Sequence, residues 1–156
     1  MSLSQTNRRV HERLGRLYAE FVEALLRNRG DVAEARWGDF RSALNEHAGL
    51  EESNILPLAE KLEVTGKGDP RVIRHDHRLL DEALDQVHAL LGDLRSRGQG
   101  DWTKVIARNL QTLARFEQVF EHHTVRECDF LYAAFDERAD EETRGKVAAV
   151  LARSLG

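Results

Sequence analysis

The sequence predicts an all-α protein, an up-down-up-down four-helix bundle with a short C-terminal helix. Apolar residues recur at steps of three and four along four long segments, and no stretch alternates with period two for long. Short polar connections separate the segments. Because long amphipathic helices joined by short connections lie antiparallel to their neighbours, the expected order is up-down-up-down.

The chain length and composition fit a single domain. The 156 residues are 41% hydrophobic and 32% charged, which suffices for a buried core and a solvated surface. One domain is therefore expected over residues 1–156, with the bundle over about 7–136 and the C-terminal helix over about 140–153. Two prolines and few aromatic residues argue against a β-sandwich.

Turn residues mark where the segments end. The four polar connections are 28–31, 65–70, 96–101 and 136–140. Asp69 is expected to cap the third helix with Pro70 at its first position, and Asp101 is expected to cap the fourth.

Each segment carries one apolar stripe, which is the face expected to point into the core. The stripes are Leu14, Tyr18, Phe21 and Leu25 in the first segment; Trp37, Phe40, Leu44, Ile55 and Leu58 in the second; Ile73, Leu80, Leu84, Val87 and Leu91 in the third; and Leu113, Phe116, Phe120, Phe130 and Ala134 in the fourth.

Composition also limits the partners. A formal net charge of −4 without a basic block gives no electrostatic footprint for nucleic acid. No apolar run approaches the roughly 20 residues that span a bilayer, and no signal peptide opens the chain, so no membrane association is expected. The single cysteine, Cys128, excludes an internal disulfide, and the cytoplasm is the expected compartment. The sequence names no protein partner.

Polar side chains interrupt every stripe, and they share one chemistry. The predicted metal ligands are His11, His47, Glu51, His77, His123 and Glu127. Two of the histidines are followed four residues later by a glutamate, a spacing that places imidazole and carboxylate on one helix face with Cβ atoms roughly 5–6 Å apart. At about 1.5 Å per residue, His11 lies near the level of His47, and His77 near that of His123.

A metal site explains these residues better than a metal-free core. A single histidine on an apolar stripe is usually a hydrogen-bonded core residue, but six buried polar groups without partners would each cost several kcal/mol. One metal site satisfies all of them. Imidazole and carboxylate ligands suit iron, manganese or zinc, and the absence of inward thiolates argues against a tetrahedral cysteine site.

The motifs resemble those of the hemerythrin-like (HHE cation-binding) domains. Residues 44–58 resemble the second-helix motif of that family and residues 120–132 its fourth-helix counterpart. Residues 76–80 resemble the third-helix signature, and residues 10–12 the first-helix histidine. The resemblance spans roughly residues 7–136 in the family's helix order. It implies a centre of two iron ions held by the six residues named above, with zinc and manganese as alternative metals.

Two departures from the oxygen-carrying members of that family bear on function. Their third helix has a histidine four residues from the one matched here by His77, where this chain has Ile73 and Asp81. Their last helix has an aspartate five residues after its histidine, where this chain has Cys128, and the carboxylate is Glu127 at four. The remaining ligand of the metal centre is expected to be Asp81, His75 or water.

Three functions follow as hypotheses. The first is a metal-binding protein that senses or handles dioxygen, nitric oxide, peroxide or iron, so that its partner is a small diatomic ligand or peroxide. The second is a di-iron enzyme that consumes peroxide or oxidises iron, although no catalytic residue is predicted. The third is a metal-free helical interaction module whose C-terminal helix docks a partner.

The remaining polar and aromatic residues receive structural interpretations. His75 lies about 200° around the helix from His77, so the stripe selects His77. His122, Glu52 and Glu121 are expected at the surface. Tyr18 and Tyr132 are expected in the core or at its boundary, and Cys128 as a packed thiol.

Overall fold

The chain is all-helical. The computed structural model describes residues 1–98 and 100–156, and no strand occurs in them. The elements are α1 (Leu3–Leu26), α2 (Gly30–Leu50), the π-helical turn η1 (Glu51–Ile55), α3 (Leu56–Lys61), the 3₁₀ turn η2 (Gly66–Gly68), α4 (Pro70–Ser96), α5 (Thr103–Arg108), α6 (Leu110–Arg126), the π-helical turn η3 (Glu127–Leu131), α7 (Tyr132–Arg138) and α8 (Glu141–Leu155).

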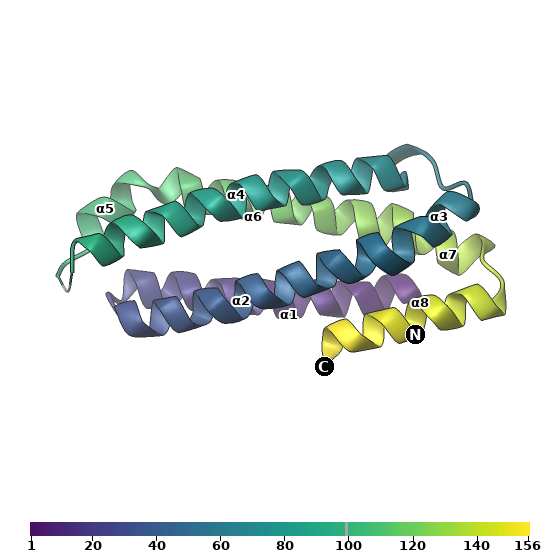
Figure 1. Ribbon diagram of the computed structural model, residues 1–156, viewed down its shortest axis with the longest axis horizontal. Coiled ribbons are helices and arrows are strands. Elements are labelled where there is room, and N and C mark those ends of the chain that lie inside the picture. The colour runs from purple at the N-terminus through teal and green to yellow at the C-terminus, as the bar shows by residue number, and fades with distance from the viewer. Residues whose placement is uncertain (99) are drawn as a thin grey trace.

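The long helices run along the long axis of the molecule (Figure 1). α1 packs along α2, and α4 packs along α6. The C-terminal helix α8 turns back to lie against α1, and it also contacts α2 and η1. It extends from Glu141 to Leu155, slightly beyond the predicted end near residue 153.

Most predicted helix boundaries are confirmed. Asp69 accepts a hydrogen bond from the Arg71 backbone N–H, and Pro70 opens α4 as expected. Asp101 accepts from the Thr103 backbone N–H at 2.9 Å, but the N-cap of α5 is Trp102, one residue after the predicted cap. The fourth predicted segment, however, is not one helix. It breaks at Asn109 between α5 and α6, and the amide of that residue donates to the Val105 carbonyl.

The core consists of two apolar clusters. The larger holds most of the aromatic rings, among them Tyr18, Phe21, Trp37, Phe40 and Phe116. The smaller lies toward the α3–α7 end and includes Ile55, Leu56, Ile73, Leu131, Tyr132, Phe135, Val147 and Leu151. Along the chain, His47 with Glu51, His77, and His123 with Glu127 each fall between residues of the larger and of the smaller cluster.

Two stripes were predicted wrongly beyond their glutamates, and both errors have one cause. In the second segment the predicted Ile55 is fully buried, but the predicted Leu58 is only partly so, and Leu56 and Ala59 are buried instead. In the fourth, the predicted Phe130 is 37% exposed and Ala134 partly buried. The side chains buried there are instead Leu131, Tyr132 and Phe135.

The cause is the π-helical turn that begins at each glutamate. In η1 the Leu56 N–H reaches back five residues to the Glu51 carbonyl, and in η3 the Tyr132 N–H does the same to Glu127. Each wide turn contains one residue more than an α-helical turn would. The buried positions that follow are therefore four, five and eight residues after the glutamate, in both segments.

The turn before α4 lies directly on η3. A Cβ atom added at Gly68 would lie 2.8 Å from the Leu131 backbone nitrogen and 2.8 Å from the Phe130 carbonyl carbon. Only glycine permits this close approach of two backbones.

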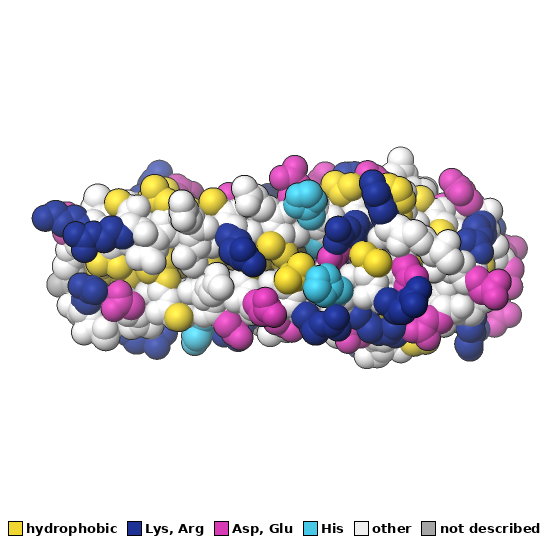
Figure 2. All heavy atoms as spheres, turned by 90° about the horizontal axis from the view of Figure 1, so that it is seen from above, with side chains coloured by type: hydrophobic (Ala, Val, Ile, Leu, Met, Phe, Trp, Pro, Cys, Tyr) yellow, Lys and Arg dark blue, Asp and Glu magenta, His cyan; other side chains and the backbone are white. Residues whose placement is uncertain are grey.

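The visible surface is charged and mixed. Figure 2 shows basic and acidic side chains interspersed over one face of the molecule, with apolar side chains between them. Among the described residues, no helix is both long and apolar enough to cross a membrane.

Candidate metal centre

All six predicted ligands lie close together, buried between the helices. His11 comes from α1, His47 from the last turn of α2, His77 from α4 and His123 from α6. Glu51 and Glu127 are the first residues of the two π-helical turns. All six are at most 4% exposed.

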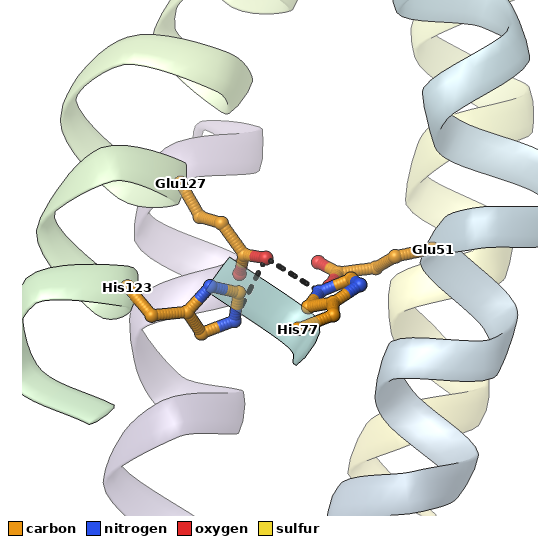
Figure 3. Close-up of side chains that lie close together, drawn as sticks. All are labelled: Glu51, His77, His123 and Glu127. Atoms are coloured by element: carbon orange, nitrogen blue, oxygen red, sulfur yellow. Dashed lines mark ion pairs between the residues drawn. The ribbon is translucent and has the colours of Figure 1, made fainter. Parts of the chain in front are cut away.

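The first group consists of Glu51, His77, His123 and Glu127, each of which offers an atom within 4.8 Å of the others (Figure 3). The Glu127 Oε1 atom lies 3.0 Å from His123 Nε2 and 3.5 Å from His77 Nε2. Glu51 approaches from the other side, with Oε2 at 3.3 Å from His77 Nε2. Two imidazoles and two carboxylates thus converge on one point.

The second group consists of His11, His47 and again Glu127. The other oxygen of this carboxylate, Oε2, lies 2.8 Å from His11 Nε2 and 3.8 Å from His47 Nε2. Glu51 also reaches this group, with Oε1 at 3.4 Å from His47 Nε2. Both glutamates therefore direct one oxygen to each pair of histidines.

Unpartnered atoms at the centre of the cluster fit a bound cation. Among the buried atoms without a hydrogen-bond partner are Glu51 Oε2, His77 Nε2, His123 Nε2 and Glu127 Oε1. A buried polar atom without a partner costs free energy, and all four are atoms that coordinate divalent metals. The buried histidine–glutamate cluster could therefore bind a metal ion.

The electrostatics of the cluster favour positive charge. Burial raises the pKa of the Glu127 carboxyl, but His123 and His11 outweigh this effect and hold that pKa well below its usual range. Burial lowers the pKa of His77, but Glu127 and Glu51 raise it more, to about 11. A proton on His77 thus balances part of the negative charge of Glu127 in the chain by itself, and a metal ion that binds His77 must displace it.

Three of the four histidines have a partner for the ring nitrogen that faces away from the cluster. The Thr124 hydroxyl donates to the Phe120 carbonyl at 2.8 Å, so its oxygen accepts from His11 Nδ1, 2.7 Å away. Such a hydrogen bond leaves the Nε2 lone pair free for a metal. The Nδ1 atom of His123 has no partner.

Glu52 lies at the surface as expected, but it also contacts the cluster. Its side chain is 46% exposed, and its carboxylate lies 2.8 Å from His77 Nδ1 and accepts its proton. The sequence pattern does not reveal this contact, because Glu51 lies on the inward face and the next residue, Glu52, points away from that face.

Two further buried residues touch the glutamates, and the sequence interpretation gave neither a role at the site. The Tyr132 hydroxyl donates to Glu51 Oε1 at 2.6 Å, and the Asn7 amide donates to Glu127 Oε2 at 3.1 Å. The extra residue in η3 brings Tyr132 inward. Asn7 lies one helical turn before His11 on the same face of α1, which is the signal that could have found it.

The residues left open as additional ligands do not join the cluster. His75 and Asp81 are exposed, and neither belongs to a metal-binding group of the described residues. His122 and Glu121 are exposed as expected. Tyr18 belongs to the aromatic cluster, where its hydroxyl donates to the Leu113 carbonyl.

Cys128 is buried beside the site without contributing to it. Its sulfur lies 3.7 Å from the Asn7 amide nitrogen, and burial raises the pKa of the thiol to about 12. It is a packed thiol, as expected from the sequence.

A shallow cleft of about 320 Å³ lies between α1 and α6, with His11 among its lining residues. The Phe120 ring stacks on the His11 imidazole at a centroid distance of 5.3 Å. Thr124 and Val125 line the same cleft.

Comparison with protein-family models, with curated proteins and with solved structures finds no match for this chain.

Proposed function

We propose that this chain is a hemerythrin-like metal-binding protein, in which α1, α2, α4 and α6 form an up-down-up-down four-helix bundle around a non-haem di-iron centre. The proposed ligands are His11, His47, Glu51, His77, His123 and Glu127. The centre would sense or handle dioxygen, nitric oxide, peroxide or iron.

The observation that carries this proposal is the sharing of Glu127 between two groups of ligands. One of its oxygens faces His77 and His123, and the other faces His11 and His47. A carboxylate that offers one oxygen to each of two sites suits a pair of cations better than a single one. The nearby Glu51 repeats the arrangement.

The donor set is compatible with iron as the metal. It consists of four imidazoles and two carboxylates, without thiolate, and such mixed nitrogen and oxygen ligands suit iron, manganese and zinc. Iron bound there would supply a redox couple and coordination positions open to a small ligand. Because the cluster is buried, the surrounding residues exclude large substrates and restrict access to small ligands.

The test is reconstitution with ferrous iron without oxygen, followed by metal analysis and optical spectra after exposure to air. We expect two iron ions per chain and the absorption of a coupled diferric centre. Glu127→Gln should lower the iron content of both positions, whereas Glu121→Gln, an exposed change on α6, should not. One ion per chain, or none, would contradict the proposal.

A further inference from the structure

The C-terminal helix α8 reaches the ligand cluster. Val147 and Leu151 are fully buried against the smaller apolar cluster, and Ser154 follows one helical turn later on the same face. The Ser154 hydroxyl lies 3.2 Å from His47 Nδ1, and both residues are buried. A helix that follows the ligand-bearing helices thus contacts one of the predicted ligands near its end. Figure 1 shows α8 turning back along the other helices.

The geometry fixes the role of this contact. The Nε2 atom of His47 is the one that faces the cluster, 3.4 Å from Glu51 Oε1 and 3.2 Å from His11 Nε2. An imidazole that binds a metal through Nε2 carries its proton on Nδ1. With a metal on Nε2, the Nδ1–H group of His47 would donate to the Ser154 hydroxyl, which would hold the ring in the orientation for binding.

The partner of His47 differs from those of the other histidines. His11 is held by Thr124 of α6, and His77 by Glu52 of η1, so these partners lie on segments that also carry ligands. Ser154 lies on a helix that carries no predicted ligand. Its own backbone carbonyl accepts a bond from Arg13 of α1 at 3.4 Å, which adds to the apolar docking of α8.

We propose that Ser154 is a positioning residue for His47, and that docking of α8 is energetically coupled to metal binding by the His11–His47 pair. This inference rests on the proposed metal-binding function. Because coupling between two events is reciprocal, metal binding at this pair strengthens the docking of α8, and docking of α8 strengthens metal binding.

The test compares three full-length variants with the unaltered chain. Ser154→Ala removes the hydroxyl, Ser154→Thr keeps it, and Ser53→Ala removes an exposed hydroxyl whose bond goes to the Gly49 carbonyl. Ferrous iron is titrated into each without oxygen, and hydrogen exchange of the α8 amides is measured with and without iron. The melting temperature without metal shows whether each variant folds.

We expect Ser154→Ala to weaken one of two iron equivalents by about tenfold, the lower end for loss of a residue that orients a metal ligand. The other equivalent should keep its affinity, and both Ser154→Thr and Ser53→Ala should bind as the unaltered chain does. Iron should slow exchange in α8 of the unaltered chain, and less so in Ser154→Ala.

The outcomes separate this inference from the proposed function. An unaltered chain that takes up no iron contradicts the proposed function and with it the coupling. An unaltered chain that binds two equivalents, while Ser154→Ala binds both with unchanged affinity, contradicts the inference alone. Equal weakening of both equivalents, with a lower melting temperature without metal, would assign Ser154 a purely structural role and overturn it.

Discussion

Two regions of the helical core are built differently. In the larger apolar cluster, α1, α2, α4 and α6 are regular α-helices, and rings such as Phe21, Phe40 and Phe116 fill the space between them. At the level of the ligand cluster, two of the chain's helical segments pass into π-helical turns, and the interior is filled by imidazole and carboxylate. Wide turns are rare and frequently occur at functional sites, so the irregularity itself indicates where chemistry is located.

The largest expected effect on stability comes from removing an aromatic ring from the larger apolar cluster. Phe40 is fully buried and packs against Tyr18 at a centroid distance of 5.2 Å and against Phe116 at 5.3 Å. Phe40→Ala should lower the free energy of unfolding by about 3–5 kcal/mol, because the cavity cannot fully close. Chemical denaturation measures this change. Leu26→Ala, at a 62% exposed position, is the control and should change stability little.

Metal bound at the ligand cluster should raise the free energy of unfolding by a similar amount. If the cluster binds iron only in the folded state, a metal concentration of about 1,000 times Kd adds about 4 kcal/mol. The melting temperature should then rise by roughly 8–16 °C. Calorimetry with and without a chelator measures the shift, and Phe40→Ala should show the same rise because its site is separate. Identical melting curves for loaded and chelated protein would contradict a structural contribution of the metal.

The same substitution, tyrosine to phenylalanine, can be made beside the ligand cluster and within the larger apolar cluster, and it sharpens the comparison of the two regions. Tyr132→Phe removes a hydroxyl that donates to the buried Glu51 carboxylate, and should cost about 1.5–3 kcal/mol without metal. Tyr18→Phe removes a bond of 3.0 Å to the neutral Leu113 carbonyl and should cost only about 1 kcal/mol. Urea denaturation of both variants measures the difference. Equal losses would mean that the charge of Glu51 contributes nothing.

Removing a wide turn should have the smallest effect on stability. Deletion of Ser53, an exposed residue of η1, places the buried residues three, four and seven positions after Glu51, which is α-helical spacing. We expect the fold to persist and its stability without metal to change by about 1 kcal/mol. Iron affinity should nevertheless fall by about tenfold, because Glu51 shifts by about 1.5 Å relative to α3.

A deletion in a regular helix is the control for this change. Glu82 is exposed in the middle of α4, and its deletion rotates every later residue by about 100°. The apolar stripe of α4 would then leave the core, so this variant should be far less stable than the Ser53 deletion. Similar stabilities for the two deletions would show that η1 is not an extra residue in an otherwise α-helical pattern.

The sequence was sufficient along α1, α2 and α4, where every predicted stripe residue before the glutamates is buried. All six residues of the cluster follow from polar positions on the four stripes. On α6 the predicted Phe120 is only partly buried. Beyond the two glutamates Ile55 is buried as predicted, but Leu58, Phe130 and Ala134 each fall one residue before a buried position, because periodicity assumes an α-helical turn and does not reveal a π-helical one. The contact of Ser154 with His47 joins residues 107 positions apart, and no local pattern encodes it.

The close approach at Gly68 extends the set of positions on which metal binding depends. Any side chain there would press on the backbone of Leu131 and Phe130, and so displace the turn that begins with Glu127. A random-mutagenesis screen for loss of iron uptake should therefore return substitutions at Gly68 alongside those of the six ligands. Nearby Gly66 has open space around it and should appear only through its left-handed backbone, at φ 71°. Substitutions in the turn before α4 would thus act on the position of the Glu127 carboxylate, almost sixty residues later in the chain.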